Sequence, residues 1–291
     1  MLQKDKLKLN ILMVLAMITW GLSWTNAKIL GTYLDPPLIM FWRFLLASLT
    51  FVFVLRITKT SFKINLSSVP IITLNSVFMI SYNYFYFKGT QIGLAGAGGV
   101  LVTTLNPILT TFFSIIFLKD RIPKKDGVGL SLGLISGCII LRIWELDYAS
   151  LYNSGNLYFI LASLSWVAVT ITTSKSQREL SFLPYSFWSF IFSTILCISL
   201  LKGENVFSII YFDWIFWFNL LILSIFAMAF GTSIYFFASV NLGPKKASSY
   251  IFLVPITAIV FSIYFLSEPP ELSTLFGGLL GMYAVYLINI K

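Results

Sequence analysis

The sequence of 291 residues contains no histidine, only two cysteines and few charged residues. Without histidine there is no imidazole for a zinc site, for a Ser-His-Asp triad or for a histidine proton relay. Cys138 and Cys197 both lie in apolar stretches, where cysteine is more often a small core residue than half of a disulfide or metal site. Acidic residues form no cluster beyond pairs in the predicted loops. We therefore expect no enzyme activity, no metal and no cofactor.

The scarcity of charge decides the class of protein. Charged residues make up 11% of the chain, hydrophobic residues 58%, and the mean hydropathy is +0.88. A soluble domain of this length needs far more charge to cover its surface. The net charge of +9 does not indicate nucleic-acid binding, because the basic residues lie in short clusters between apolar runs. This is the pattern of membrane proteins, whose basic loop residues set their orientation in the bilayer.

Ten apolar stretches predict an all-α integral membrane protein with ten transmembrane helices. Each stretch is close to the roughly 20 residues that a membrane-spanning helix needs, and clusters of charge, glycine and proline separate them. The predicted spans are 10–30, 36–57, 67–88, 92–118, 126–142, 153–175, 181–201, 212–239, 243–267 and 271–290. The first follows three lysines like a signal peptide, but it is too long and lacks a clear cleavage site, so we interpret it as an uncleaved span.

The distribution of lysine and arginine predicts the orientation. With the N-terminus inside, fifteen of these residues fall on the inner side and five on the outer half. The outer five are Lys28, Arg43, Lys88, Arg142 and Lys202. Because cytoplasmic loops carry the excess of positive charge, we expect both termini in the cytoplasm and a multi-pass protein of the plasma membrane, which in a bacterium is the inner membrane.

The two halves of the chain carry the same landmarks at an offset of 146 or 148 residues. The matched pairs are Trp20 and Trp166, Trp42 and Trp188, Pro107 and Pro255, Asp120 and Glu268, Gly129 and Gly277, and Gly133 and Gly281. Such self-similarity is typical of membrane transporters built from two repeats, here 1–145 and 146–291. Because each repeat has five spans, an odd number, the second must cross the membrane in the opposite sense. This predicts an inverted repeat, which suits alternating access.

These landmarks also resemble the EamA-type families of the drug/metabolite transporter superfamily, over about 10–142 and 153–290. The resemblance rests on Trp20-Gly21, on residues 43–47, on the spacing from Pro107 to Asp120, on Gly129, Gly133 and Gly137, and on their partial repetition at Pro255, Glu268, Gly277 and Gly281. The second half departs from the pattern at Val167, opposite Gly21, and at Ser189, opposite Arg43. The resemblance implies ten transmembrane helices and export or exchange of small metabolites. It fixes no substrate, because the superfamily carries amino acids, nucleotide sugars, sugar phosphates and other compounds.

The candidate site lies where landmarks of both repeats reach the middle of the predicted spans, since inverted-repeat transporters bind substrate near the bilayer midplane. The candidate substrate-binding residues are Trp20, Trp24, Arg43, Asn83, Tyr86, Thr103, Asn106, Trp166, Tyr235 and Tyr250. Indole rings offer a flat apolar wall with one donor, which suits organic solutes. The alternative is that the tryptophans only pack, because tryptophan is also common in membrane cores and interfaces.

Two prolines, Pro107 and Pro255, are the candidate hinges. Each lacks an N–H and displaces the carbonyl four residues earlier, that of Thr103 or Ile251. In a membrane such carbonyls are tolerated only against protein or a watery cavity. The alternative is a kink for packing, repaired by a hydroxyl such as that of Thr103.

Arg43 is the only basic residue clearly within a predicted span, where a permanent charge is costly and indicates function. It could bind a carboxylate or phosphate of the substrate, or a gate residue; alternatively its side chain could extend to the outer headgroups. Asp120 and Glu268 end the fourth and ninth spans, where we expect structural roles in ion pairs or at helix starts. No acid lies in the middle third of any span, so proton coupling through a buried acid has no visible carrier.

The glycine spacing of the fifth and tenth spans predicts close helix packing, either within a monomer or in a homodimer through these spans. The expected partners are a small-molecule substrate and the lipid bilayer, and no nucleic acid. The expected function is export or exchange of small organic metabolites, such as amino acids, by alternating access. The alternative is a flippase for lipids or lipid carriers, which requires a cavity that opens sideways to lipid.

Overall fold

The computed structural model describes residues 3–118, 124–145, 147–176 and 181–289, and over these ranges the regular structure is entirely helical. The longer helices are α1 (Gln3–Leu30), α2 (Pro36–Ile57), α3 (Val69–Ile92), α4 (Ala95–Leu118), α5 (Lys124–Ile140), α7 (Asn156–Ser176), α8 (Phe182–Ile198), α12 (Val254–Leu266) and α13 (Leu272–Asn289). One further rod is composite: α9 (Trp214–Leu221), the π-helix η4 (Ile222–Thr232) and α10 (Ser233–Asn241). The short pieces are η1 (Leu66–Ser68), η2 (Ile143–Glu145), α6 (Tyr148–Asn153), η3 (Val206–Tyr211), α11 (Pro244–Ser248) and η5 (Ser249–Leu253).

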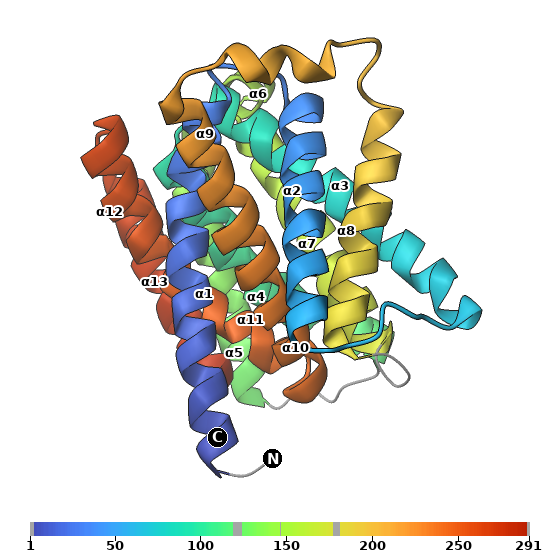
Figure 1. Cartoon of the computed structure of the whole chain (residues 1–291). Helices are drawn as coiled ribbons and strands as arrows, with labels where there is room; N and C mark the ends of the chain where they lie inside the picture. Colours follow the sequence, from blue (N-terminus) through green and yellow to red (C-terminus); the bar gives the residue numbers. More distant parts are fainter. Residues whose placement is uncertain (1–2, 119–123, 146, 177–180, 290–291) are drawn as a thin grey trace.

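The helices form one bundle, in which α1, α2 and α8 run from one end to the other and α3 crosses obliquely (Figure 1). α1 begins and α13 ends at the same end of the bundle, which we call the terminal end; the opposite one is the distal end. Accordingly α2 and α9 begin at the distal end, α8 begins at the terminal end, and η3 crosses the distal end. The short helices α6 and η3 were not expected from the sequence, because both lie in connections between apolar stretches.

Six helical segments of the described chain are long and apolar enough to cross a membrane. They are Leu7–Leu30, Pro36–Ile57, Ala95–Ser114, Asn156–Ser176, Trp214–Asn241 and Pro244–Leu266. Three shorter apolar stretches occur in α5, α8 and α13. α3 is also 24 residues long but carries buried Asn75, Ser76, Asn83 and Thr90. Its polar side chains therefore face other helices rather than the surroundings.

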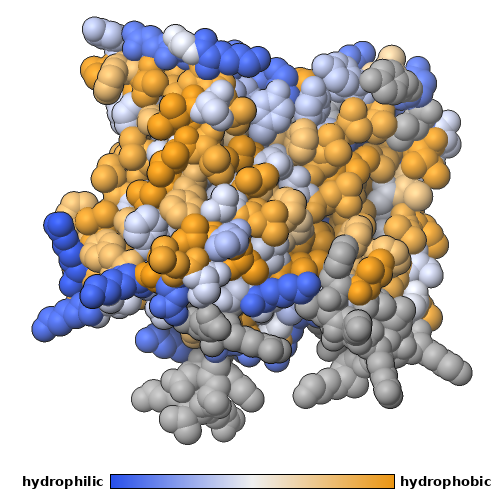
Figure 2. All heavy atoms as spheres, turned by 90° about the vertical axis from the view of Figure 1, so that its right-hand side faces the viewer, coloured by the Kyte–Doolittle hydropathy of each residue, from blue (hydrophilic) through white to orange (hydrophobic). Residues whose placement is uncertain are grey.

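Apolar side chains cover the sides of the bundle, and hydrophilic residues gather at its two ends (Figure 2). Phe53, Phe226 and Phe276 are each more than half exposed although they lie within helices. An apolar belt of this kind would be unstable in water but suits the hydrocarbon of a bilayer. The belt and the long apolar helices make the protein a multi-pass membrane protein.

Local chemistry fixes several helix boundaries. Pro36 and Pro37 occupy the first positions of α2, where an N–H has no helical partner. The Asn205 and Asp213 side chains cap η3 and α9 by accepting hydrogen bonds from the Phe207 and Phe216 amides. These caps hold the connection at the distal end in place.

The two halves of the chain meet through equivalent helix pairs. α2 packs on α8, α4 on α12, and α5 on α13. The contact of α1 with the rod α9–η4–α10 has its counterpart in the contact of α7 with α3. Likewise α1 packs on α12 as α7 packs on α4. The sequence repeat therefore reappears as a repeated set of helix contacts around the centre of the bundle.

The glycines of α13 serve packing within the chain. A Cβ at Gly277 or Gly281 would collide with Ile140 of α5 or Thr104 of α4. The Ser136 hydroxyl of α5 also donates to the Gly277 carbonyl at 2.7 Å. Close helix approach of this kind is what the small-residue spacing predicts. A homodimer through α5 and α13 remains a prediction.

The two candidate hinges differ in structure. Pro107 lies inside α4, whereas Pro255 is at the start of α12 and follows the 3₁₀ turn η5. The expectation that the Ile251 carbonyl is left free is wrong, because it accepts the Val254 amide as the backbone tightens before the proline. The Thr103 hydroxyl donates to the Gly99 carbonyl, so it does not serve its own displaced carbonyl.

Candidate functional site

A small cavity lies at the centre of the bundle, between the two halves. Its lining residues come from α1, α2, α3, α4, α7 and η4: Trp20, Ser23, Trp24, Arg43, Tyr82, Asn83, Thr103, Asn106, Trp166, Met228 and Thr232. All are buried except Trp20 and Tyr82, which are partly buried. The cavity volume of about 20 Å³ holds a water molecule but no metabolite, since ligand pockets are usually several hundred Å³. The structure is therefore closed around its centre.

Seven of the ten candidate residues line this cavity: Trp20, Trp24, Arg43, Asn83, Thr103, Asn106 and Trp166. Two more lie directly behind the lining. The Tyr86 ring is 4.7 Å from that of Trp24, and the Tyr235 ring is 5.1 Å from that of Trp20.

Tyr250 does not line the central cavity, so the structure does not bring it together with the other candidate residues. Its hydroxyl bonds to Asn10 Oδ1 at 2.6 Å, near the terminal end of α1. In the sequence Tyr250 lies only five residues before Pro255, which favours a position beside the cavity. It belongs instead to the 3₁₀ turn η5, whose tighter winding changes the direction in which successive side chains point.

The two matched tryptophans meet at the centre. The rings of Trp20 and Trp166 are 5.0 Å apart and nearly perpendicular, a favourable edge-to-face arrangement. The Tyr82 ring lies 4.6 Å from Trp166, and the Tyr235 ring 5.4 Å from it. The repeat thus places its most conspicuous residues in one aromatic cluster shared by both halves.

The π-helix η4 packs against α1 and forms part of the cavity wall beside it. In η4 the Ala227 carbonyl accepts the Trp20 indole N–H at 3.0 Å. A Cβ at Gly231 would lie 2.7 Å from the same indole nitrogen, so only glycine allows this approach. π-turns commonly mark functional sites, and this one brings Met228 and Thr232 to the cavity.

Arg43 is held inside the protein. Its side chain is only 4% exposed, and its Nη1 donates to Asn83 Oδ1 at 2.7 Å. The guanidinium also lies 5.5 Å from the ring centres of Tyr86 and Phe87, a cation–π distance. The alternative in which Arg43 extends to the headgroups is therefore not realised. Its Nε has no hydrogen-bond partner.

Four lining residues were missed from the sequence: Ser23, Tyr82, Met228 and Thr232. Tyr82 had a usable signal, because it lies one turn before Tyr86 on a helix face already thought to be polar. The other three had none. Hydroxyls and methionines are ordinary in membrane helices, and Met228 and Thr232 depend on the π-helix.

Equivalent polar contacts close the bundle above and below the cavity. Toward the distal end, Asn26 donates to Asn219 Oδ1 at 2.8 Å. Toward the terminal end, Thr173 donates to Asn75 Oδ1 at 3.3 Å. The first contact joins α1 to α9 and the second joins α7 to α3, so the two contacts link corresponding helices of the repeat. Asn219 follows Asn75 by 144 residues and Thr173 follows Asn26 by 147, so the correspondence holds for the helices and not residue by residue.

A second pair of contacts lies nearer the ends. The Trp42 indole donates to the Val206 carbonyl at 2.9 Å, and the Trp188 indole to the Phe62 carbonyl at 2.7 Å. Each tryptophan thus reaches the connecting segment of the other half. We call Asn26–Asn219 with Trp42–Val206 the distal closure, and Thr173–Asn75 with Trp188–Phe62 the terminal closure.

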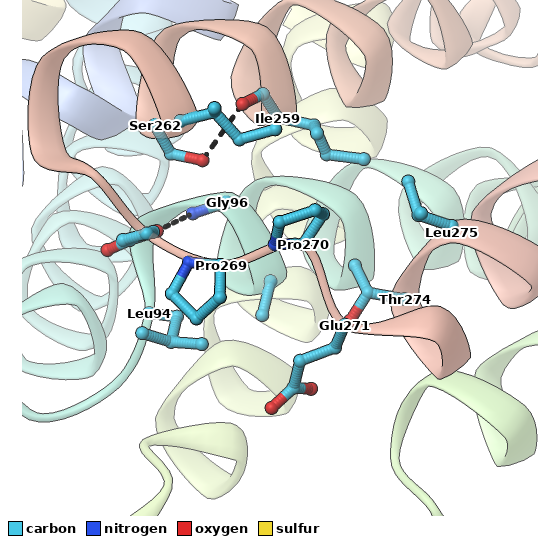
Figure 3. Close-up of a pocket in the computed structure, with 12 residues that line it drawn as sticks. Leu94, Gly96, Ile259, Ser262, Pro269, Pro270, Glu271, Thr274 and Leu275 are labelled. Carbon is cyan, nitrogen blue, oxygen red and sulfur yellow. Dashed lines mark hydrogen bonds between the residues drawn. The ribbon is translucent and has the colours of Figure 1, made fainter.

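Glu268 has a structural position at the distal end. Its carboxylate accepts the amides of Ala95 and Gly96 at 2.8 and 2.9 Å, at the start of α4; the bond to Gly96 is drawn in Figure 3. Ser267 with φ +55° ends α12 and turns the chain there. A carboxylate suits the positive end of a helix dipole. The helix start that it stabilises lies in the other half, not in the next helix of the chain. Its match Asp120 lies outside the described residues.

The cavity offers guanidinium, amide, hydroxyl and indole groups. In the described part of the chain, no three histidine, cysteine or carboxylate side chains gather to hold a metal ion. Hydrogen bonding, one positive charge and aromatic contact are therefore the chemistry available to a bound solute.

Comparisons with known proteins agree on the type of protein. Residues 7–142 and 153–290 match the model of the EamA-like transporter family. The "Uncharacterized transporter YvbV" of Bacillus subtilis (strain 168) is 30% identical, with 100% of this chain and 94% of the relative covered. An "Uncharacterized transporter" of Archaeoglobus fulgidus is 25% identical, with 98% of both covered.

Two further proteins are similar to this chain, one over part of its sequence and one in its fold. The "S-adenosylmethionine uptake transporter" of Rickettsia bellii (strain RML369-C) is 25% identical over 64% of this chain and 62% of its own. A solved crystal structure superimposes with a TM-score of 0.70, over 97% of this chain and 96% of the other, at 16% sequence identity. At that identity the likeness concerns the fold alone.

Proposed function

The chain belongs to the EamA-like transporter family, and from this premise we propose that it exports or exchanges small organic metabolites by alternating access. In the proposed arrangement, ten transmembrane helices form two inverted repeats, 1–145 and 146–291. Both termini lie in the cytoplasm, and the membrane is the plasma membrane. The substrate binds in the central cavity.

The arrangement of helices and charges supports this topology. Beside the six long apolar segments, α3, α5, α8 and α13 run along the same bundle. Arg56 lies in the last turn of α2, Lys59 and Lys63 follow that helix, and Lys245 and Lys246 follow α10. These basic residues therefore gather at the terminal end. By the positive-inside rule that end faces the cytoplasm.

The observation that carries the proposal is a closed polar cavity between two equivalent closures. A transporter must expose one site to either side of the membrane in turn, and inverted repeats make the two exits alike. Opening the distal closure alone would expose the cavity to the outer side. Opening the terminal closure alone would expose it to the cytoplasm. Because both are formed here, the structure corresponds to an occluded state, and the cavity must widen to hold a solute.

No acid lies among the lining residues, so the proposal does not include proton coupling through a buried carboxylate. Exchange or facilitated export needs none. The burial of nearly the whole lining favours this function over a lipid flippase, which needs a lateral opening. The Rickettsia bellii relative is named for uptake of S-adenosylmethionine, a small organic solute, which supports the substrate size but not the direction of transport.

The test begins with a search for a solute. Purified protein would be heated with amino acids, sugar phosphates, nucleosides and amphipathic compounds, because a ligand of the native state raises its apparent melting temperature. Compounds that do so would be followed in counterflow exchange by proteoliposomes. We expect specific exchange that Trp20→Ala and Asn106→Ala abolish while the protein remains folded. Trp214→Ala, at a 73% exposed position, is the matched control. Unchanged exchange in both cavity variants would overturn the proposal.

A further inference from the structure

The two repeats differ at the cavity, where one carries a charged residue and the other does not. Arg43 and Ser189 occupy equivalent positions, 146 residues apart. Ser189 packs against α3. Its hydroxyl accepts a hydrogen bond from Asn75 Nδ2 at 3.4 Å, and its carbonyl accepts one from the Ser76 hydroxyl at 3.0 Å. Arg43 instead lines the cavity. One half thus supplies a cation at the place where the other supplies a hydroxyl engaged in packing.

The guanidinium of Arg43 is pre-positioned. Asn83 Oδ1 accepts a hydrogen bond from Nη1 of Arg43, and Asn83 is itself fixed because its Nδ2 donates to the Met79 carbonyl at 2.7 Å. Tyr86 and Phe87 lie against the guanidinium. This leaves Nε, which is buried and donates to no group. Nε lies on one edge of the planar fork, and such an edge binds the paired oxygens of a carboxylate or phosphate.

The charge of Arg43 is not balanced by an acid. Among the described side chains, no carboxylate lies within ion-pairing distance of Arg43. The ion pair that the described residues do form joins Arg142 to Glu145 at the surface. The buried acidic residue among the described ones is Glu268, whose carboxylate accepts hydrogen bonds from the Ala95 and Gly96 amides. A buried charge without a partner is costly, so a ligand that supplies the negative charge gains binding energy there.

A second unpartnered group lies in the same cavity. Asn106 is 3% exposed, and its Oδ1 accepts no hydrogen bond. Its position directly before Pro107 in α4 places it on the side of the first repeat, like Arg43. The indole rings of Trp20, Trp24 and Trp166 form the remaining large surfaces. The central cavity therefore combines the guanidinium of Arg43, the free amide oxygen of Asn106 and the flat apolar faces of the indoles.

We propose that Arg43 binds the carboxylate or phosphate of an anionic organic solute, with Asn106 accepting a hydrogen bond from the solute and the indoles contacting its apolar part. This rests on the proposed transport function and narrows it to a substrate class. Selectivity for the anion arises from the first repeat alone, because the equivalent position in the second is Ser189.

The test uses matched compounds that differ in charge. The probes are phenylacetate with phenylacetamide, lactate with lactamide, and phenyl phosphate with phenol. Their affinities would be measured by thermal shift on detergent-solubilised full-length protein. We expect at least one anion to bind at least about tenfold more tightly than its neutral partner, since hydrogen bonds to charged groups are the stronger ones. The two acid types tell whether carboxylate or phosphate is preferred.

Two variants assign the effect to Arg43. Arg43→Gln should remove the preference for the anion, whereas Arg56→Gln, at an exposed position of the same helix, should keep it. If Arg43→Gln fails to fold, Arg43→Lys replaces it as the test. Lysine keeps the positive charge but lacks the planar guanidinium that binds two oxygens at once, so the preference for the anion over its neutral partner should fall about tenfold. The proposal is overturned if no anion is preferred, or if the Arg43 variants keep the wild-type preference.

Binding and transport separate this proposal from the previous one. Anion preference without any exchange in proteoliposomes would leave the site intact and contradict the transport function. Exchange of neutral and anionic probes at equal rates, with equal affinities, would support the transport function and overturn the anion site.

Discussion

At the scale of single residues, the cavity is defined by contacts between parts of the chain far apart in sequence. Trp20 touches Trp166 and donates to Ala227, and Arg43 is held by Asn83. The sequence could predict most of these residues because bulky aromatic, amide and charged side chains are conspicuous in the middle of apolar stretches. Tyr250 could not be excluded in the same way, because its direction depends on a 3₁₀ turn that leaves no pattern in the sequence.

Gly231 tests the position of Trp20. We expect Gly231→Ala to push the indole out of its place, because the new Cβ would lie 2.7 Å from its nitrogen. Overpacking of this kind costs about 1–3 kcal/mol, and exchange should fall at least tenfold. The control is Gly127→Ala in α5, where a Cβ would meet nothing within 4 Å. Thermal melting and counterflow would be measured for both. Normal exchange by Gly231→Ala would show that Trp20 need not be held there.

At the scale of the elements, the sequence predicted nearly all the long helices, because each is an apolar stretch bounded by charge, glycine or proline. It did not predict η4, because a π-helix has the same residues as an α-helix and differs in which carbonyls they reach. It also did not predict that Glu268 stabilises the start of α4. That contact joins the two halves and depends on how they pack.

Removal of the Glu268 carboxylate should destabilise the protein rather than abolish transport. In Glu268→Ala the Ala95 and Gly96 amides lose their acceptor, and loss of a helix cap costs about 0.5–2 kcal/mol. Glu271→Ala, three residues later and exposed, should have little effect. Melting temperature and counterflow rate would be compared. If Glu268→Gln melts normally but no longer exchanges solute, Glu268 takes part in transport.

The cap of α9 predicts a local dependence on pH. The Phe216 amide, which donates to Asp213 at 3.0 Å, holds the pKa of that carboxyl below its ordinary value of 3.8, with a further contribution from the Tyr33 hydroxyl. Because the pKa is lowered in the folded state, the cap is fully stabilising above about pH 4 and is lost as the pH falls through the folded value.

The protection of the first amides of α9 against hydrogen exchange, relative to their intrinsic exchange rates at each pH, would therefore fall on acidification below pH 4. Asp213→Asn should remove this dependence, because asparagine also caps helices but does not ionise. A loss of protection of equal size in Asp213→Asn would assign the effect to another group.

At the scale of the whole molecule, the repeat organises both the fold and the proposed mechanism. The helix pairs of the two halves correspond, and so do the contacts that close each end of the cavity. The sequence predicted the repeat, and seven of the residues that it indicated for the site line the central cavity. It could not predict that both closures are formed at once, because relative helix positions are a property of the packed state.

The most direct test of alternating access measures both closures together. In a background without native thiols (Cys138→Ala and Cys197→Ala), Asn26→Cys and Thr173→Cys would be treated with a membrane-impermeant thiol reagent from one side at a time. We expect Asn26→Cys to react only from the distal side and Thr173→Cys only from the terminal side. Attachment at one closure should stop exchange and protect the other. Reaction of both positions from the same side, or undiminished exchange after labelling, would contradict the account.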